Sequence, residues 1–198
     1  MKKLIKNGKI VTSEKIIDGD ILIEDGKIKK IGKIDVKVDE IIDVKGKYIL
    51  PGLVEVHGHL REPGLEQKED IPHGTRAGLA GGFTSVIDMP NTKPPTTTVA
   101  LLQDKIKKIY PKRSFIDYAF FMGVSKDHLK EIEKVGKQDI VGVKVFTAGH
   151  ETTPTTIPDD KTLAKLFEIL GKRGIKIAVH AEDQFLINYY NEVFKKTG

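Results

Sequence analysis

The chain has 198 residues, of which 39% are apolar and 31% charged, enough for one globular domain or slightly more. The net charge is +5, but charges of both signs alternate along predicted helices and turns without interleaved aromatic residues, which argues against a nucleic-acid-binding stripe. The sequence contains no cysteine, which excludes disulfides and thiolate metal ligands. It also shows no signal peptide and no apolar run long enough to cross a membrane, so we expect a cytoplasmic protein with no membrane partner.

Residues 1–47 are predicted to form a small β domain of short strands and tight turns. Asn7-Gly8 is a turn signal between apolar ends, and Asp25-Gly26 lies at the centre of a hairpin pattern. Residues 41–44 supply one more short strand. Because roughly 45 residues bury little core, we expect this domain to lean on the next one or to need strands from elsewhere.

Residues 48–198 alternate between strand and helix patterns. Repeated βα units predict an α/β fold with a parallel sheet, either open and doubly wound or part of a (β/α)8 barrel. No glycine-rich nucleotide-binding motif is present. The predicted strands are 48–59, 83–89, 114–121, 140–146 and 174–180, and the predicted helices are 68–79, 98–109, 127–135, from Asp159 or Asp160 to near Gly171, and 182–195.

Two histidines stand at the carboxyl end of the first of these strands, which reads as buried. His57 and His59 are two residues apart, so on a strand they point to the same face. Adjacent imidazoles at a strand end are typical of a site for a cation such as zinc. The alternative is a pair of surface histidines in a loop. The residues at the ends of the other predicted strands are needed to choose between a metal site and a surface loop.

Later strand ends carry further candidates. Lys144 interrupts an apolar strand, where a buried lysine loses hydration unless it is paired or neutralised. A neutral lysine can react with CO₂ to give a carbamate that bridges two cations. Taken alone, Lys144 fits an outward or frayed strand position, but His180 at the end of the next strand favours a metal site together with His57 and His59.

Other polar residues near the strand ends receive no metal-ligand role. The second strand of this region, 83–89, delivers Asp88 near its end and then Asn91. His73 and His128 are predicted to lie on helix surfaces in structural roles, and His150 falls in the loop after the fourth strand, where nothing assigns it a role.

Four segments together resemble dihydroorotases of the amidohydrolase superfamily: VEVHGHLREPG, GTRAGLAGGFTSVIDMPNTKPPTT, GVKVF and VHAED. The resemblance covers nearly the whole chain and implies a (β/α)8 TIM barrel beside a small N-terminal β domain. It also implies a binuclear site, usually zinc, with His57 and His59 on one metal, His180 on the second, and Lys144 bridging both as its carbamate. Arg61 and Asn91 would hold the carboxylate of the substrate.

The implied reaction is the reversible hydrolysis of dihydroorotate to N-carbamoyl-L-aspartate in pyrimidine synthesis. The alternatives are a non-catalytic dihydroorotase-like scaffold and an allantoinase- or hydantoinase-type enzyme. The expected assembly is a homo-oligomer or an association with aspartate transcarbamoylase.

Length is where the chain departs from this family. A complete barrel needs roughly 250 residues, whereas the stretch from 48 to 198 accommodates about five βα units. The family's further metal-ligand histidine on strand six and its catalytic aspartate on strand eight have no place before residue 198. We therefore expect the N-terminal portion of a dihydroorotase, poorly stable and with little or no activity by itself.

Overall fold

In the computed structural model, the described residues are 1–149, 156–157 and 159–197. They form two compact units, Met1–Gly52 and Leu53–Gly198. The first is a sheet in the order β3-β2-β1-β4, with β5 paired to β1. Its strands are β1 (Lys2–Val11), β2 (Ile16–Glu24), β3 (Lys27–Gly32), β4 (Glu40–Asp43) and β5 (Tyr48–Ile49).

The predicted hairpin of the first unit is confirmed. Asp25 and Gly26 have φ of 49° and 76°, and they join the antiparallel strands β2 and β3. Positive φ at both central residues is what a tight two-residue hairpin needs. The predicted short strand at residues 41–44 corresponds to β4, which pairs in parallel with β1.

The predicted turn at Asn7-Gly8 is wrong. β1 continues through it, and the register with β2 shifts between Ile5 and Gly8 as in a β-bulge. Asn7 has φ of 58°, and its N–H donates to Asp20 Oδ1 at 2.9 Å. A left-handed residue whose N–H is satisfied by a side chain can therefore bend the strand without ending it.

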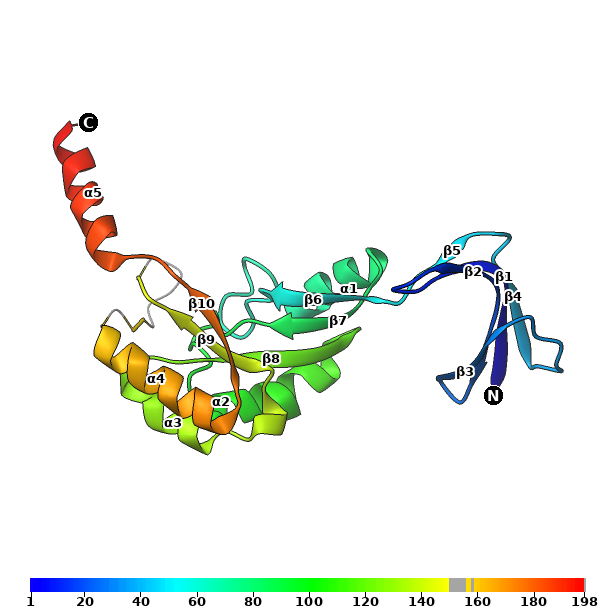
Figure 1. Cartoon of the computed structure of the whole chain (residues 1–198). Helices are drawn as coiled ribbons and strands as arrows, with labels where there is room; N and C mark the ends of the chain where they lie inside the picture. The colour runs from blue at the N-terminus through cyan, green and yellow to red at the C-terminus, as the bar shows by residue number, and fades with distance from the viewer. Residues whose placement is uncertain (150–155, 158, 198) are drawn as a thin grey trace. The chain divides into compact units, whose positions relative to one another are not determined.

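The second unit is built on a five-stranded parallel sheet in the order β10-β9-β8-β7-β6 (Figure 1). Strand and helix alternate along the chain, as predicted. The strands are β6 (Leu53–Gly58), β7 (Phe83–Asp88), β8 (Asp117–Gly123), β9 (Gly142–Phe146) and β10 (Lys176–His180). The α-helices are α1 (Ile71–Ala80), α2 (Val99–Asp104), α3 (Leu129–Lys134), α4 (Asp160–Arg173) and α5 (Gln184–Thr197).

Short helical turns adjoin these elements. α2 continues into a π-helical turn, Lys105–Ile109, so that the predicted helix over 98–109 is present. The 3₁₀ turns are Tyr110–Lys112, Lys126–His128 and Lys137–Asp139. Asp70, Thr98 and Asp159 precede α1, α2 and α4, and each side chain accepts a backbone N–H of the first helical turn.

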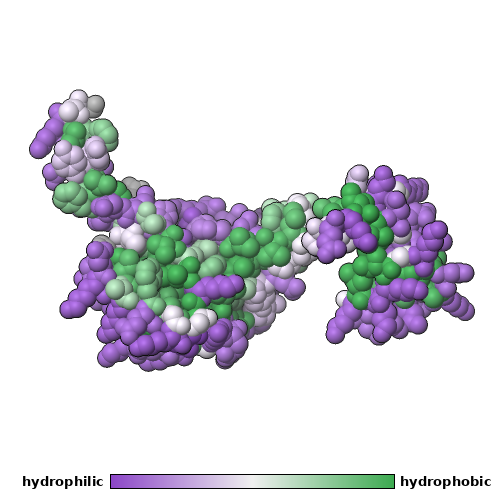
Figure 2. Space-filling view, in the orientation of Figure 1, coloured by the Kyte–Doolittle hydropathy of each residue, from purple (hydrophilic) through white to green (hydrophobic). Residues whose placement is uncertain are grey.

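The core of the second unit lies between the sheet and its helices. Every residue of β9 is buried, and Leu166 and Leu170 of α4 contribute to the same core. Figure 1 shows α2, α3 and α4 along one side of the sheet, and Figure 2 shows hydrophilic residues over the outer faces of α3 and α4. No helix in the described part of the chain is long and apolar enough to cross a membrane.

The first barrel strand differs from the prediction in two ways. Residues Tyr48 and Ile49 pair with β1 instead of opening this strand. β6 is also exposed where a buried strand was expected, since Val54 and Val56 have exposed fractions of 53% and 60%. The reason is its place at the edge of the sheet, where it pairs only with β7 among the described strands.

Candidate functional site

The two histidines of the first barrel strand lie side by side. His57 is near the end of β6 and His59 follows its last residue, Gly58. Their ring centroids are 5.2 Å apart, at an interplanar angle of 48°. The spacing of two residues therefore places both imidazoles on one face, as the strand pattern predicted.

Both imidazoles favour the neutral form. Burial, reinforced by the positive charges of Arg61 and His57, lowers the pKa of His59 to about 4. Burial and the charge of Lys144 also lower the pKa of His57. A neutral imidazole keeps a nitrogen lone pair available for a cation.

His59 has one polar atom without a partner in the described part of the chain. Its Nδ1 is buried and makes no hydrogen bond to those residues. A buried polar nitrogen without a partner is costly, and a bound cation or a ligand-borne group at this end of β6 is a way to offset that cost. This unpartnered nitrogen fits the prediction of a metal site at His57 and His59.

Lys144 is buried in the middle of β9, with 3% of its surface exposed. It pairs with Ala178 of β10 on one side and Gly123 of β8 on the other. Its Nζ lies 4.9 Å from the centre of the Phe146 ring, and burial lowers the pKa of the amine. The frayed strand position is therefore excluded, and the amine is shifted toward the neutral form that a carbamate requires.

His180 ends β10 and is held by its own neighbours. Its Nε2 is 2.7 Å from Glu182 Oε2, and its ring centre is 5.5 Å from that of Phe146. His180, like Lys144, contributes to lowering the pKa of His57, so residues of β9 and β10 act electrostatically on the end of β6. In the described residues, however, no three His, Asp or Glu side chains form a ready metal-binding group.

The loops that carry Arg61 and Asn91 lie against each other. The N–H of Lys93 donates to the carbonyl of Pro63 at 2.8 Å. Arg61 has φ of 59°, and its charge lowers the pKa of His59. Asn91 is 9% exposed, and its Oδ1, a hydrogen-bond acceptor, is buried without a hydrogen-bond partner among the described residues. A guanidinium can bind a carboxylate through two parallel hydrogen bonds, whereas Asn91 could donate to one only through its NH₂ group.

Replacing Gly64 with alanine is expected to disturb this contact and to lower the free energy of unfolding by about 2 kcal/mol. Gly64 has φ of 89°, and a Cβ there would lie 2.0 Å from the carbonyl oxygen of Lys93. Gly82 is the matched control, because it has φ of 90° and a Cβ added there would meet nothing within 4 Å. Gly82→Ala is expected to cost about 1 kcal/mol. Urea denaturation of both variants measures the difference; equal losses would show that the contact with Lys93 is irrelevant.

Two ion pairs, of which only that of Asp88 and Lys105 is buried on both sides, were not predicted. Asp88, noted only as a strand-end residue, is fully buried and accepts a hydrogen bond from Lys105 Nζ. Glu62 accepts the N–H of Ile71 at 3.1 Å and lies 2.7 Å from Arg113 Nε. One signal was available, because Lys105 stands among the apolar positions of the helix over 98–109, three residues after Leu102.

The other histidines behave differently. Asp70 caps α1 by accepting the backbone N–H of His73, and His73 Nδ1 lies 2.7 Å from Asp70 Oδ2. His128 Nδ1 lies 2.7 Å from Ser125 Oγ. Both contacts agree with structural roles. His150 lies outside the described residues.

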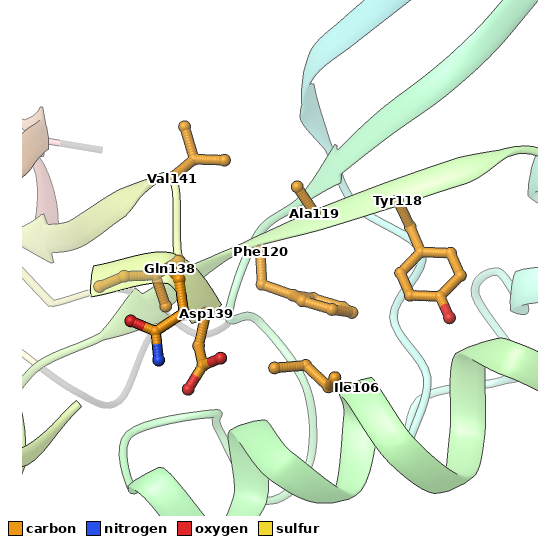
Figure 3. Close-up of a pocket in the computed structure, with 8 residues that line it drawn as sticks. Ile106, Tyr118, Ala119, Phe120, Gln138, Asp139 and Val141 are labelled. Carbon is orange, nitrogen blue, oxygen red and sulfur yellow. The ribbon is translucent and has the colours of Figure 1, made fainter. Parts of the chain in front are cut away.

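A pocket of about 220 Å³ lies away from the strand ends that carry the candidate residues. Its lining includes Tyr118 and Phe120 of β8, Ile106, Gln138 and Asp139 (Figure 3). The predicted ligand and substrate residues do not line it. This pocket is therefore separate from the candidate site.

Polar side chains at the carboxyl ends of parallel βα units define a TIM-barrel type of α/β protein. The family model of the amidohydrolase family matches residues 48–197, and the chain belongs to that family. It is 38% identical over 192 residues to a dihydroorotase of Aquifex aeolicus, covering 94% of this chain and 44% of the relative.

The chain is also similar to hydantoinases, and this similarity again covers nearly all of its residues. An L-hydantoinase of Paenarthrobacter aurescens is 32% identical over 198 residues, covering 98% of this chain and 43% of the relative. The solved structure of an L-hydantoinase (dihydropyrimidinase) from Arthrobacter aurescens has a TM-score of 0.89 at 32% identity, covering 99% of this chain and 44% of that one. The chain therefore spans less than half the length of these relatives.

Proposed function

We propose that this chain belongs to a metal-dependent cyclic amidohydrolase whose substrate is dihydroorotate, opened reversibly to N-carbamoyl-L-aspartate in pyrimidine synthesis. The observation that carries the proposal is the place of Arg61, a cation two residues after His59, on a loop whose Pro63 carbonyl accepts the N–H of Lys93 from the segment after Asn91. Similarity to dihydroorotases supports the same substrate. A dihydroorotate carboxylate needs a cationic partner of this kind.

The residues present fit a metal site. The donor set includes the imidazoles of His57 and His59, both with a lowered pKa, and the buried amine of Lys144, whose pKa is also lowered; the Nδ1 of His59 has no hydrogen-bond partner among the described residues. His57 and His59 would hold one zinc ion, His180 a second, and Lys144 would bridge them after N6-carboxylation. Bound zinc supplies a hydroxide near neutral pH and polarises the amide carbonyl.

The protein's own residues orient the substrate for this chemistry. Arg61 would bind the carboxylate through its planar fork, and Asn91 would donate from its amide to the same group. Fixing the carboxylate sets the position of the ring relative to the end of β6, where His57 and His59 lie. None of the described residues is assigned the proton transfer to the leaving nitrogen.

Replacing Arg61 with lysine in the protein at its natural length is expected to raise the KM for dihydroorotate about 10–100-fold. Lysine keeps the charge but loses the two parallel hydrogen bonds. Hydantoin carries no carboxylate, so its hydrolysis is expected to change little. Arg76→Lys is the matched control, because Arg76 packs on the Phe115 ring at 4.4 Å. A wild-type preference for hydantoin over dihydroorotate would instead assign a hydantoinase.

Replacing Lys144 with methionine is expected to abolish incorporation of carbon from bicarbonate. Wild-type protein loaded with zinc and ¹³C-bicarbonate should show a carbamate signal by NMR, and the variant should not. Zinc content should fall from about two ions per chain to about one. Lys176→Met, a change at an exposed lysine of β10, is the control. A carbamate signal that persists in Lys144→Met would place the modification elsewhere.

The cellular setting follows from the same proposal. We propose a cytoplasmic location, with assembly through a second copy of the chain or with aspartate transcarbamoylase. Co-purification of the full-length protein with aspartate transcarbamoylase tests the second assembly, and the molar mass from light scattering tests the first.

A further inference from the structure

We propose that the buried ion pair of Asp88 and Lys105 is a positioning device that fixes the turn carrying His59 and Arg61. The inference rests on the proposed function of that site and adds two residues to it. Neither side chain is assigned to metal or substrate. Their effect would be transmitted through the backbone of Leu60.

Asp88 reaches the turn directly. It ends β7 and is fully buried, and its Oδ1 accepts the N–H of Leu60 at 3.1 Å. Leu60 lies between His59 and Arg61, so the hydrogen bond restrains the His59–Leu60 peptide, the first of the two peptide bonds between the candidate residues. The next residue after Asp88 adds a second restraint, because the Met89 N–H donates to the Gly58 carbonyl at 2.8 Å.

Lys105 orients Asp88 from the opposite side. Its Nζ donates to Asp88 Oδ2, leaving Oδ1 for Leu60. The ammonium is itself enclosed, 5.3 Å from the centre of the Phe120 ring and 5.7 Å from that of Tyr110. Lys105 is 2% exposed, so it has little freedom to leave the carboxylate.

A buried ion pair contributes little net stability, because the hydration free energy lost by both charges offsets their attraction. Well-packed apolar residues often replace a buried ion pair without loss of stability. An apolar pair, however, has no acceptor for the Leu60 N–H. The His59–Leu60 peptide bond would then lose its side-chain restraint, while the surrounding fold would remain packed. Partners that orient metal ligands in this way commonly affect metal affinity.

Two double variants separate positioning from stability. Asp88→Asn with Lys105→Met removes both charges but keeps an oxygen for the Leu60 N–H. Asp88→Leu with Lys105→Met removes the charges and the acceptor while keeping similar volumes. We expect both variants to fold, the second with a lower urea midpoint because the buried Leu60 N–H loses its acceptor. Zinc affinity should stay within about threefold of wild type for the first variant and be about 10–100-fold weaker for the second. Zinc competition with a chromophoric chelator measures the affinity.

Amide hydrogen exchange supplies a readout that needs neither zinc nor turnover. In the wild type we expect the Leu60 amide and the hydrogen-bonded Met89 amide both to exchange slowly. It should stay slow in the Asn-containing variant and become about tenfold faster in the Leu-containing one.

Each outcome decides one of the proposals. Wild-type zinc affinity and slow Leu60 exchange in the Leu-containing variant would overturn the positioning role. If the double variants fail to fold, fast Leu60 exchange in the wild type overturns it and slow exchange supports it. Wild-type protein that binds no zinc would contradict the proposed function, while the exchange measurement would still test the role of Asp88.

Discussion

Replacing Lys105 alone with methionine is expected to lower the free energy of unfolding by about 3–5 kcal/mol. The change leaves the Asp88 carboxylate fully buried with its charge no longer paired to Lys105. An uncompensated buried charge loses hydration without recovering an equivalent attraction, so it must be protonated or reach water through local unfolding. Urea unfolding followed by circular dichroism measures the loss.

Lys108 offers a matched control for this change. It lies in the same helical turn and pairs with Asp104 at 2.6 Å, with 74% of its side chain exposed. Lys108→Met is expected to change stability by no more than about 0.5 kcal/mol, because exposed ion pairs contribute little. Equal losses for the two variants would mean that the burial of the Asp88–Lys105 pair has no energetic consequence.

Replacing His59 with asparagine is expected to reduce zinc affinity strongly and to slow dihydroorotate hydrolysis at least about 1,000-fold. The variant removes an imidazole from the proposed ligand pair, and loss of metal-assisted catalysis corresponds to several kcal/mol of activation free energy. Zinc content by elemental analysis and turnover at natural length are the two measurements.

His73→Asn is the control for the loss of an imidazole. His73 lies in α1, and its side chain contacts Asp70 at the start of that helix. The control is expected to retain zinc and activity. Retention of zinc and full turnover by His59→Asn would remove His59 from the ligand set and leave the hydrolase proposal without its central pair.

Local patterns predicted most of the second unit. Apolar runs marked the strands and apolar periodicity marked the helices, because each signal depends on neighbours a few residues apart. The common face of His57 and His59 followed from strand geometry, and their rings are indeed adjacent. Their role as metal ligands, and that of Lys144 and His180, stays a prediction.

Contacts between distant segments were beyond such patterns. The pairing of Lys105 with Asp88 depends on how the helix after β7 packs back on the sheet. The bulge at Asn7 depends on the Asp20 carboxylate, which lies on the neighbouring strand. The exposure of β6 depends on how many strands flank it. Each of these is set by tertiary neighbours, which a single sequence does not display.

Arg61 occupies a backbone conformation with φ of 59°, which asparagine adopts more readily than arginine does. Substitution by asparagine would therefore relax the backbone while removing the cation proposed to bind the substrate carboxylate. At this position the backbone conformation favours asparagine, whereas binding of the substrate carboxylate favours arginine. In evolutionary terms, a change to cyclic amides without a carboxylate would therefore cost the fold little stability, and only selection for the carboxylate-bearing substrate would maintain the arginine.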